Sequence, residues 1–270
     1  MSTPPTARPV ALVTGASAGI GKELARVLAR DHDLILSARR VEELTALAAE
    51  LKAAHGTTCH VLPADLADPH GPRHLFDATT AAGLAVDVLV NNAGFGDHGP
   101  FADADLAKLL RMIQVNVTAL TELTGLFLPG MRARGRGRLL NVGSVAGFQP
   151  GPLMAVYYAT KAYVVSLSEA LANELSGTGV TVTCLCPGPT HSEFRAVAGI
   201  RQGFSVAKAM DTRAVAEAGV RGMRRGKRLV IPGFRNRLLI FAERFLPFGF
   251  AVGIHFLRLG SVADGPHSGV

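Results

Sequence analysis

Residues 13–21 read Val-Thr-Gly-Ala-Ser-Ala-Gly-Ile-Gly, and this stretch decides the fold. It ends the apolar run 10–13 and opens an Ala- and Leu-rich segment at 22–30, so the pattern predicts a strand, a tight turn and a helix start. Backbone N–H groups at a helix N-terminus favour an anion, and glycines let the backbone approach it closely. The turn therefore suits the pyrophosphate of a dinucleotide, although glycines also serve such turns for steric reasons alone.

The composition is that of a globular protein. The chain has 270 residues, of which 48% are hydrophobic, and this is enough to bury a sizeable core. It has three cysteines, no secretory signal pattern and no metal-like Cys/His cluster, which favours a reducing compartment and predicts a cytoplasmic protein with no bound metal. Cys184 and Cys186 fall on one strand face, and we expect both to be inert core residues.

The formal net charge of +7 raises the question of a nucleic-acid partner. The basic residues are scattered along the chain. The densest run, 132–138, is short, has no interleaved aromatic side chain, and joins a predicted helix to a predicted strand. We interpret this run as a solvated loop and expect no nucleic-acid partner.

Short apolar runs alternate with Ala- and Leu-rich segments of helical length along the whole chain. Strands that are apolar nearly throughout, with helices between them, imply a parallel sheet covered on both faces. The predicted fold class is therefore α/β, a doubly wound parallel sheet with no interdomain linker. The expected strands are residues 10–13, 34–37, 58–62, 86–90, 138–142, 180–185 and 228–231.

The residues that directly follow each expected strand carry the cofactor prediction, because ligands of such sheets bind beyond the carboxyl ends of the strands. Arg39 and Arg40 follow the second strand, where an NAD-preferring site usually has an acidic residue. Two arginines instead suit the 2′-phosphate of NADP. Asp65 follows the third strand and has two interpretations, a cap of the next helix or an acceptor for the adenine amino group.

Four polar residues, Asn116, Ser144, Tyr157 and Lys161, have a spacing that suits proton and hydride chemistry. Tyr157 is the predicted acid. A free phenol titrates at about pH 10, so a nearby ammonium is needed to lower its pKa, and Lys161 lies one helical turn later. Tyr158 is also within one turn of Lys161, so helical geometry alone does not choose between the two tyrosines.

These motifs in this order resemble the short-chain dehydrogenase/reductase family. The resemblance covers about residues 11–231 and rests on the glycine turn, on Asn-Asn-Ala-Gly at 91–94, on Ser144, on Tyr157 with Lys161 four residues later, and on Pro-Gly at 187–188. It implies a single-domain Rossmann fold of seven parallel strands, which we place at residues 1–232. It also implies NAD(P)-linked carbonyl or alcohol chemistry on a small-molecule substrate.

The resemblance also assigns roles. The family spacing chooses Tyr157 over Tyr158. Ser144 resembles the serine that donates to the substrate oxygen, and Asn116 resembles the asparagine that holds a water linked to Lys161. The arginines resemble those of NADP-preferring members, so we expect NADP(H) over NAD(H), although Ala18 stands where many such members have a second basic residue.

The predicted site has three parts. The catalytic residues are Asn116, Ser144, Tyr157 and Lys161. The residues expected to contact the cofactor are Gly15, Ser17, Gly19, Ile20, Gly21, Arg39, Arg40, Asp65, Leu66, Asn92, Ala93, Gly94, Tyr157, Lys161, Pro187, Gly188 and Thr190. The residues expected to contact the substrate are Ser144, Val145, Leu153 and Tyr157.

The expected pocket walls are largely apolar. They comprise Val145, Phe148, Leu153, Met154 and the segment 190–210. An apolar pocket favours an aliphatic or aromatic ketone, or a 3-oxoacyl group, as the substrate.

The C-terminal extension, 233–270, is rich in phenylalanine and arginine. Six of the thirteen phenylalanines lie in it, and its longest uncharged run, 245–257, is shorter than the roughly twenty residues that a spanning helix needs. It is either an amphipathic segment that rests on an anionic membrane, making the protein peripheral at the membrane surface, or a hydrophobic extension that covers the substrate site or a partner subunit. We favour the second, because family members commonly form dimers or tetramers.

A rival function is a catalytically silent NADP-binding module, acting as a redox sensor or a membrane-surface scaffold on the same fold. Fold alone does not exclude it, because function depends on the site. Against it stands the complete set of four catalytic-type residues, which a binding-only protein need not retain.

Overall fold

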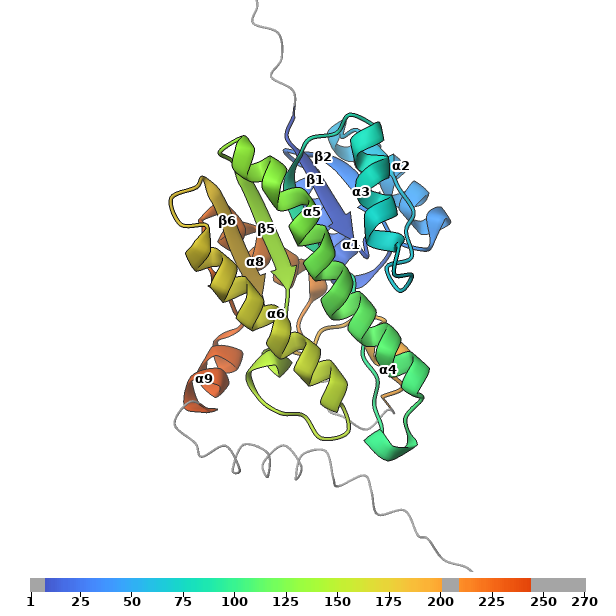
Figure 1. Ribbon diagram of the computed structural model, residues 1–270, viewed down its shortest axis with the longest axis vertical. Coiled ribbons are helices and arrows are strands. Elements are labelled where there is room, and N and C mark those ends of the chain that lie inside the picture. The colour runs from blue at the N-terminus through green and yellow to red at the C-terminus, as the bar shows by residue number, and fades with distance from the viewer. Residues whose placement is uncertain (1–7, 201–208, 244–270) are drawn as a thin grey trace, which may run out of the picture.

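Seven parallel strands form one sheet in the order β3-β2-β1-β4-β5-β6-β7 in the computed structural model of the chain, which describes residues 8–200 and 209–243 (Figure 1). Every predicted strand is confirmed to within one residue at either end. The strands are β1 (Val10–Thr14), β2 (Asp33–Ser37), β3 (Cys59–Val61), β4 (Val86–Asn91), β5 (Gly137–Val142), β6 (Val180–Leu185) and β7 (Leu229–Val230).

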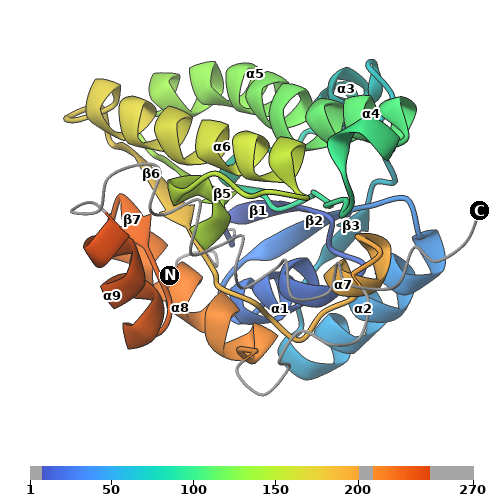
Figure 2. The ribbon, with the colours of Figure 1, turned by 90° about the horizontal axis from the view of Figure 1, so that it is seen from below.

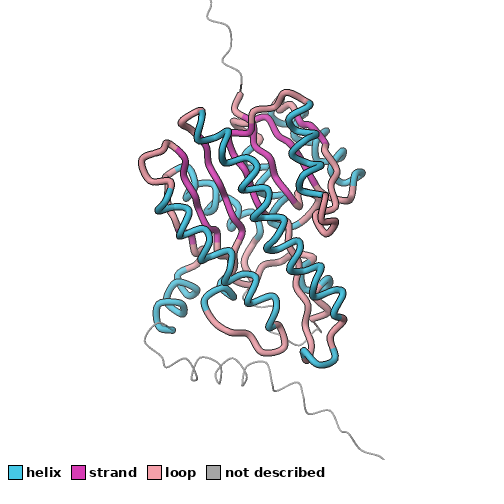
Figure 3. The backbone as a smooth tube through the Cα atoms, viewed as in Figure 1, coloured by secondary structure: helices cyan, strands magenta, loops and turns pink. Residues whose placement is uncertain are grey.

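The sheet lies between two layers of helices, as the view in Figure 2 and the tube in Figure 3 show. One face packs against α1 (Gly19–Leu28), α2 (Val41–His55) and α8 (Thr212–Arg224). The other packs against α3 (Gly71–Ala81), α5 (Leu120–Ala133) and α6 (Ala155–Glu174). Leu12 and Val13 of β1 are both fully buried in opposite clusters, which is why this strand is apolar throughout.

Shorter helices connect and flank these layers. A helix α4 (Leu106–Ile113) continues through a π-helical turn η2 (Gln114–Ala119) into α5. The remaining elements are the 3₁₀ turns η1 (Phe101–Asp103) and η3 (Val145–Phe148), the short helix α7 (Phe194–Val197), and α9 (Phe234–Glu243).

The strand order reverses between β1 and β4. The chain runs from β1 outward to β2 and β3, and then returns to place β4 on the other side of β1. Loops that leave the carboxyl ends of β1 and β4 therefore diverge to opposite sides of the sheet. A crevice at this position is the usual ligand site of a doubly wound fold.

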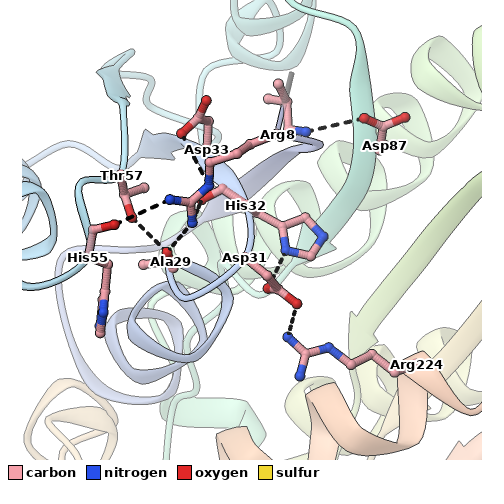
Figure 4. Close-up of polar contacts among 10 residues, drawn as sticks. Arg8, Ala29, Asp31, His32, Asp33, His55, Thr57, Asp87 and Arg224 are labelled. Carbon is pink, nitrogen blue, oxygen red and sulfur yellow. Dashed lines mark hydrogen bonds and ion pairs between the residues drawn. The ribbon is translucent and has the colours of Figure 1, made fainter. Parts of the chain in front are cut away.

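A group of polar contacts joins the elements at the amino ends of β1 and β2 (Figure 4). Arg8 donates to the carbonyl oxygen of Ala29 at 2.6 Å and lies 3.8 Å from the Asp33 carboxylate. Arg224 of α8 forms an ion pair with Asp31 at 2.6 Å. These contacts tie α8 and the turn after α1 to the sheet, at the end opposite to the loops described below.

The basic run 132–138 joins α5 to β5, as expected. Its arginines are exposed, and two of them contact the amino end of β4. Arg134 donates to the Val86 carbonyl at 2.6 Å, and Arg136 lies 3.3 Å from Asp87. The run thus connects and anchors two elements.

Candidate active site

The glycine turn between β1 and α1 has a shape that side chains would prevent. Gly15 has a φ of +66°, and a Cβ there would lie 2.8 Å from Asn92 Nδ2 and 3.0 Å from Ala93 Cα. Gly19 has a φ of +54°. A Cβ on Gly21 would lie only 2.3 Å from the Gly15 carbonyl oxygen. The turn therefore lies tightly against the carboxyl end of β4.

Two polar side chains, Asn92 just after β4 and Thr14 at the end of β1, hold this turn against the carboxyl end of β4. Asn92 Nδ2 donates to the carbonyl oxygens of Thr14 at 2.8 Å and Gly15 at 3.2 Å. The Thr14 hydroxyl accepts from the N–H groups of Asn92 and Ala93 and donates to the Val90 carbonyl. The Asn92 side chain, predicted as a cofactor contact, thus shapes the cradle. Thr14 was not predicted, although a threonine that ends a strand just before the glycine was a usable signal.

The N-terminus of α1 offers backbone donors. Ala18 is its N-cap, with extended backbone and no side-chain cap, and the first turn has no acidic residue. Ile20 packs against the core. A cradle that only glycine permits, ending at uncapped N–H groups, fits the pyrophosphate of a nicotinamide dinucleotide.

Two arginines lie after β2, where the sequence predicts the 2′-phosphate. Both are exposed. Arg40 donates to Ser17 Oγ at 3.2 Å and forms an ion pair with Glu193 at 3.0 Å. Within residues 8–200 and 209–243, the Arg39 side chain makes no ion pair or hydrogen bond, so it is available to an anion.

After β3, the N-cap of α3 is His70, with no side-chain cap, so the helix-capping interpretation is wrong for Asp65. Its carboxylate accepts from the Ala67 N–H at 3.0 Å, while the side chain stays exposed and keeps a second oxygen for other donors. Leu66 is 7% exposed and packs into the core under α3. Any contact of Leu66 with a cofactor would therefore come from its backbone.

The structure brings the four predicted catalytic residues together at the carboxyl ends of β4 and β5. Ser144 lies two residues after β5, and Tyr157 and Lys161 lie on α6; Ser144 and Lys161 are buried, and Tyr157 is half-buried. The Ser144 hydroxyl is hydrogen-bonded to Tyr157. A Cβ on Gly94 would lie 3.0 Å from Asn116 Oδ1 and 3.7 Å from Lys161 Nζ, so both side chains border Gly94.

The Asn116 side chain is fully engaged with the protein. Its Oδ1 accepts from the Phe95 N–H at 3.1 Å, and its Nδ2 donates to the Phe95 carbonyl at 3.0 Å and to Thr160 Oγ1 at 3.1 Å. Asn116 lies in the π-helical turn η2, a feature that is frequent at functional sites. The side chain therefore joins the loop after β4 to α6, and a role in holding a water stays a prediction.

Burial dominates the titration of the catalytic pair. It raises the pKa of Tyr157, and the hydrogen bond from Ser144 offsets only part of this effect. The expected lowering by Lys161 is not found, because the ammonium lies 5.9 Å from the centroid of the Tyr157 ring and donates to the Val142 carbonyl at 2.8 Å. Burial also lowers the pKa of Lys161, from 10.5 to about 8.

The lowered pKa of Lys161 predicts a pH-dependent stability difference between the wild type and a Lys161→Met variant. Below pH 8 the native state holds a buried charge, whereas between pH 8 and 10.5 the unfolded lysine binds more protons than the native one, so stability rises with pH. We expect the Tm of the wild type minus that of the variant to rise by several degrees from pH 7 to pH 10. A constant or falling difference in thermal melts would contradict this.

Two buried cysteines support the backbone below Ser144. Cys184 and Cys186 are fully buried free thiols, as predicted for core residues, and their sulfurs lie 3.5 Å apart. A Cβ on Gly143 would lie 2.9 Å from one sulfur and 3.0 Å from the other. Glycine at this position allows the backbone after β5 to pack directly against the two thiols. Ser144, the next residue, then lies at the site.

The loop after β6 meets the same site. The Pro187 carbonyl accepts from the Val145 N–H at 3.0 Å, which joins this loop to η3. Gly188 is covered by Asn236 of α9, since a Cβ there would lie 2.6 Å from Asn236 Nδ2. Thr190 pairs with Met210 across an isolated parallel bridge. The start of the C-terminal extension therefore packs beside the site, while residues 244–270 lie outside the described part of the chain.

A small cavity borders Tyr157. Its volume is about 30 Å³, and Leu153 and Met154 line it as predicted, whereas Val145 and Phe148 do not. Leu153 has a left-handed φ of 62°, and its carbonyl accepts from the Gly99 N–H at 2.8 Å. This contact places residues before α4 beside the cavity. The sequence did not predict that the cavity is also lined by Asp97, Gly99, Phe101, Ala104, Leu109 and Met112.

Residues 8–200 and 209–243 contain neither a metal-type cluster nor a membrane-spanning helix. No group of three His, Cys, Asp or Glu side chains there is arranged to hold a metal ion. No helix in these ranges has the length and apolarity required to cross a bilayer.

Known proteins are similar to this chain in sequence and in architecture. The family model described as short chain dehydrogenase matches residues 9–202. A ketoacyl reductase of Nostoc sp. is 34% identical over 208 residues, which cover 74% of this chain and 72% of that protein.

Two solved structures are similar over nearly the whole chain. A short-chain dehydrogenase from Sphingobium yanoikuyae in complex with NADPH is 33% identical, with a TM-score of 0.80, and the match covers 97% of this chain and 98% of that one. A bulky-bulky ketone specific alcohol dehydrogenase from Comamonas testosteroni is 28% identical, with a TM-score of 0.76 and 98% of each chain covered.

Proposed function

Because this chain belongs to the short-chain dehydrogenase/reductase family, we propose that it is an NADP(H)-dependent ketoreductase whose substrate is a lipophilic ketone or a 3-oxoacyl compound. Membership makes the protein an oxidoreductase of CH–OH groups that uses a nicotinamide cofactor. The observation that carries the proposal is the meeting of Ser144, Tyr157 and Lys161, with Lys161 bordering Gly94.

Residues of this chain supply the proton and a second hydrogen bond to the substrate oxygen. Reduction adds a hydride to the carbonyl carbon and a proton to the oxygen; the cofactor, when bound, supplies the hydride. Tyr157 is the proton donor, and its phenol carries the proton at neutral pH, since burial raises a pKa that is already about 10 in a free phenol. The Ser144 hydroxyl donates a second hydrogen bond to the developing alkoxide.

The preference for NADP(H) is supported by Arg39 and Arg40, which follow β2. A guanidinium pairs with a phosphate through charge-assisted hydrogen bonds that the ribose hydroxyl of NAD(H) cannot match. The NADPH complex of the Sphingobium yanoikuyae relative agrees with this choice.

The substrate class is supported by the side chains around the cavity. Phe101, Leu109, Met112, Leu153 and Met154 surround its space with apolar atoms. Two relatives, a ketoacyl reductase and a bulky-bulky ketone specific alcohol dehydrogenase, have names that agree with a substrate of this class.

We also infer that the chain forms a homo-oligomer through α4. Leu106, Leu110 and Ile113 are 63%, 56% and 39% exposed and lie on one face of this helix at i, i+4 and i+7 spacing. An exposed apolar row of this kind suits a second copy of the same helix.

The test is a purified-protein assay of NADPH oxidation against a panel of alkyl and aryl ketones, 3-oxoacyl thioesters, small polar ketones and sugars. We expect turnover of the lipophilic and 3-oxoacyl members, with at least about tenfold lower kcat/KM for NADH. Turnover of polar members alone would contradict the substrate class. Tight NADPH binding without turnover of any member would favour the silent binding module, and a monomeric mass in light scattering would contradict the oligomer.

A further inference from the structure

Three consecutive residues after β6 each contact a different part of the proposed site. Ser192 meets the glycine turn, Glu193 meets the arginine after β2, and Phe194 meets the catalytic tyrosine. In Figure 2, α7, which begins at Phe194, lies beside α2 at the carboxyl ends of the strands. This segment, Ser192 to Phe194, therefore crosses the face on which the cofactor would bind.

Ser192 lies on the N-terminus of α1. A Cβ added to Gly19 would be 3.4 Å from the Ser192 Cβ, so Ser192 lies close to the glycine turn. The Ser192 hydroxyl lies 3.4 Å from that of Thr190. The space in front of the uncapped N–H groups of α1 is thus bordered by this side chain.

Glu193 binds the arginine that we assign to the 2′-phosphate. Arg40 Nη2 is 3.0 Å from Glu193 Oε2 and Nη1 is 3.4 Å from Oε1, so the pairing is bidentate. The two side chains are 48% and 60% exposed, and such exposed pairs contribute little to stability. A phosphate with up to two negative charges is a stronger partner for the same guanidinium.

Phe194 covers Tyr157. The two ring centroids are 5.0 Å apart, and a Cβ on Gly96 would lie 2.6 Å from Phe194 Cζ. The neighbouring cavity of about 30 Å³ has room for little more than a water molecule. The Phe194 ring therefore occupies space directly beside the ring of the proposed proton donor.

The base of the segment is fixed. The Met210 N–H donates to the Pro189 carbonyl at 2.8 Å, and the His191 N–H donates to the Met210 carbonyl at 3.1 Å. The segment thus leaves a fixed strand pairing, and the Arg40–Glu193 pair holds its other side.

We propose that the Arg40–Glu193 pair is a latch that holds Phe194 over Tyr157, and that the 2′-phosphate of NADP(H) releases it by taking Arg40 from Glu193. This inference rests on the proposed function and deepens it, because it links the choice of cofactor to access of the substrate. Cofactor binding and release of the segment are coupled by competition, because the Arg40 guanidinium cannot bind the 2′-phosphate and the Glu193 carboxylate in the same bidentate geometry.

The test uses two ligands that differ by a single phosphate, adenosine 2′,5′-bisphosphate and adenosine 5′-monophosphate. Hydrogen exchange of the wild-type protein, measured by mass spectrometry on peptides covering residues 191–199, reports the segment directly. We expect the bisphosphate to speed this exchange by up to about fivefold, the equivalent of an exposed pair of about 1 kcal/mol, and the monophosphate to have no effect.

Three variants sharpen the test. In Glu193→Gln, we expect fast exchange without ligand, no further response, and bisphosphate binding up to about fivefold tighter with unchanged monophosphate binding. Glu217→Gln removes another arginine-paired carboxylate, on α8, and should behave as the wild type. Because the chain has no tryptophan, a Phe194→Trp variant gives a second readout, a red shift in emission with the bisphosphate alone.

The outcomes separate the two proposals. An equal response to both ligands would show that the 5′-phosphate displaces Ser192 and would overturn the latch. Tighter binding of the bisphosphate with no response of residues 191–199 would also overturn it, while leaving the NADP(H) preference intact. Equal calorimetric affinity for the two ligands would contradict that preference itself.

Discussion

Replacing Tyr157 with phenylalanine is expected to lower kcat for ketone reduction by about 10²- to 10⁴-fold, the usual contribution of a positioned general acid. The substitution removes one oxygen atom and keeps the ring, so the packing against Phe194 remains. We therefore expect the Kd for NADPH to stay within about twofold of the wild type. Steady-state kinetics and a titration of NADPH fluorescence measure the two quantities separately.

The neighbouring tyrosine provides a matched control. Tyr158 lies on the same helix and packs over Gly151, where a Cβ would lie 2.4 Å from its ring. Tyr158→Phe removes the same hydroxyl from the adjacent position, and we expect kcat within about threefold of the wild type. If the two variants lost activity equally, the assignment of Tyr157 as the acid would be wrong.

Removing both arginines after β2 is the second large expected effect. The Arg39→Ala, Arg40→Ala double variant loses the charged donors proposed for the 2′-phosphate, each worth about 1.5–3 kcal/mol. We expect the Kd for NADPH to rise by about 10²- to 10⁴-fold, while the Kd for NADH changes by less than about fivefold. Fluorescence titrations with the two cofactors give both values.

A control is needed to separate the effect of local contacts on NADPH affinity from the effect of the protein's net charge. The Arg132→Ala, Arg138→Ala double variant also removes two exposed positive charges, from the region that joins α5 to β5. We expect its affinity for NADPH to fall by no more than a few-fold, because distant surface charges are screened. A comparable loss in both double variants would mean that the general field of the protein, and not Arg39 and Arg40, selects the cofactor.

The strands were predictable because their signal is local. A strand buried on both faces must be apolar along its length, and residues such as Leu12 and Val13 satisfy this without reference to the rest of the chain. Once a parallel sheet is inferred, its topology places all strand ends together. Positions such as Ser144, just past a strand, then follow from the pattern alone.

Properties that depend on packing were not predictable. The titration of Tyr157 is set by burial, and helical spacing to Lys161 carries no information about the surrounding atoms. Glu193 and Arg40 are 153 positions apart, so their pairing depends on the path of a loop that has no periodic pattern. The π-helical turn at Asn116 also looks like ordinary helix in the sequence, although its extra residue per turn re-aims the side chain.

The polar contacts around Arg8 have a consequence for engineering this protein. They hold β1, the turn after α1 and α8 at one end of the sheet, whereas every proposed catalytic and cofactor contact lies at the other. Free-energy changes at distant sites without shared partners are additive. Thermostabilising substitutions introduced at the Arg8 end can therefore be combined with substitutions that reshape substrate scope, and the stability gained there can offset what new active-site variants lose.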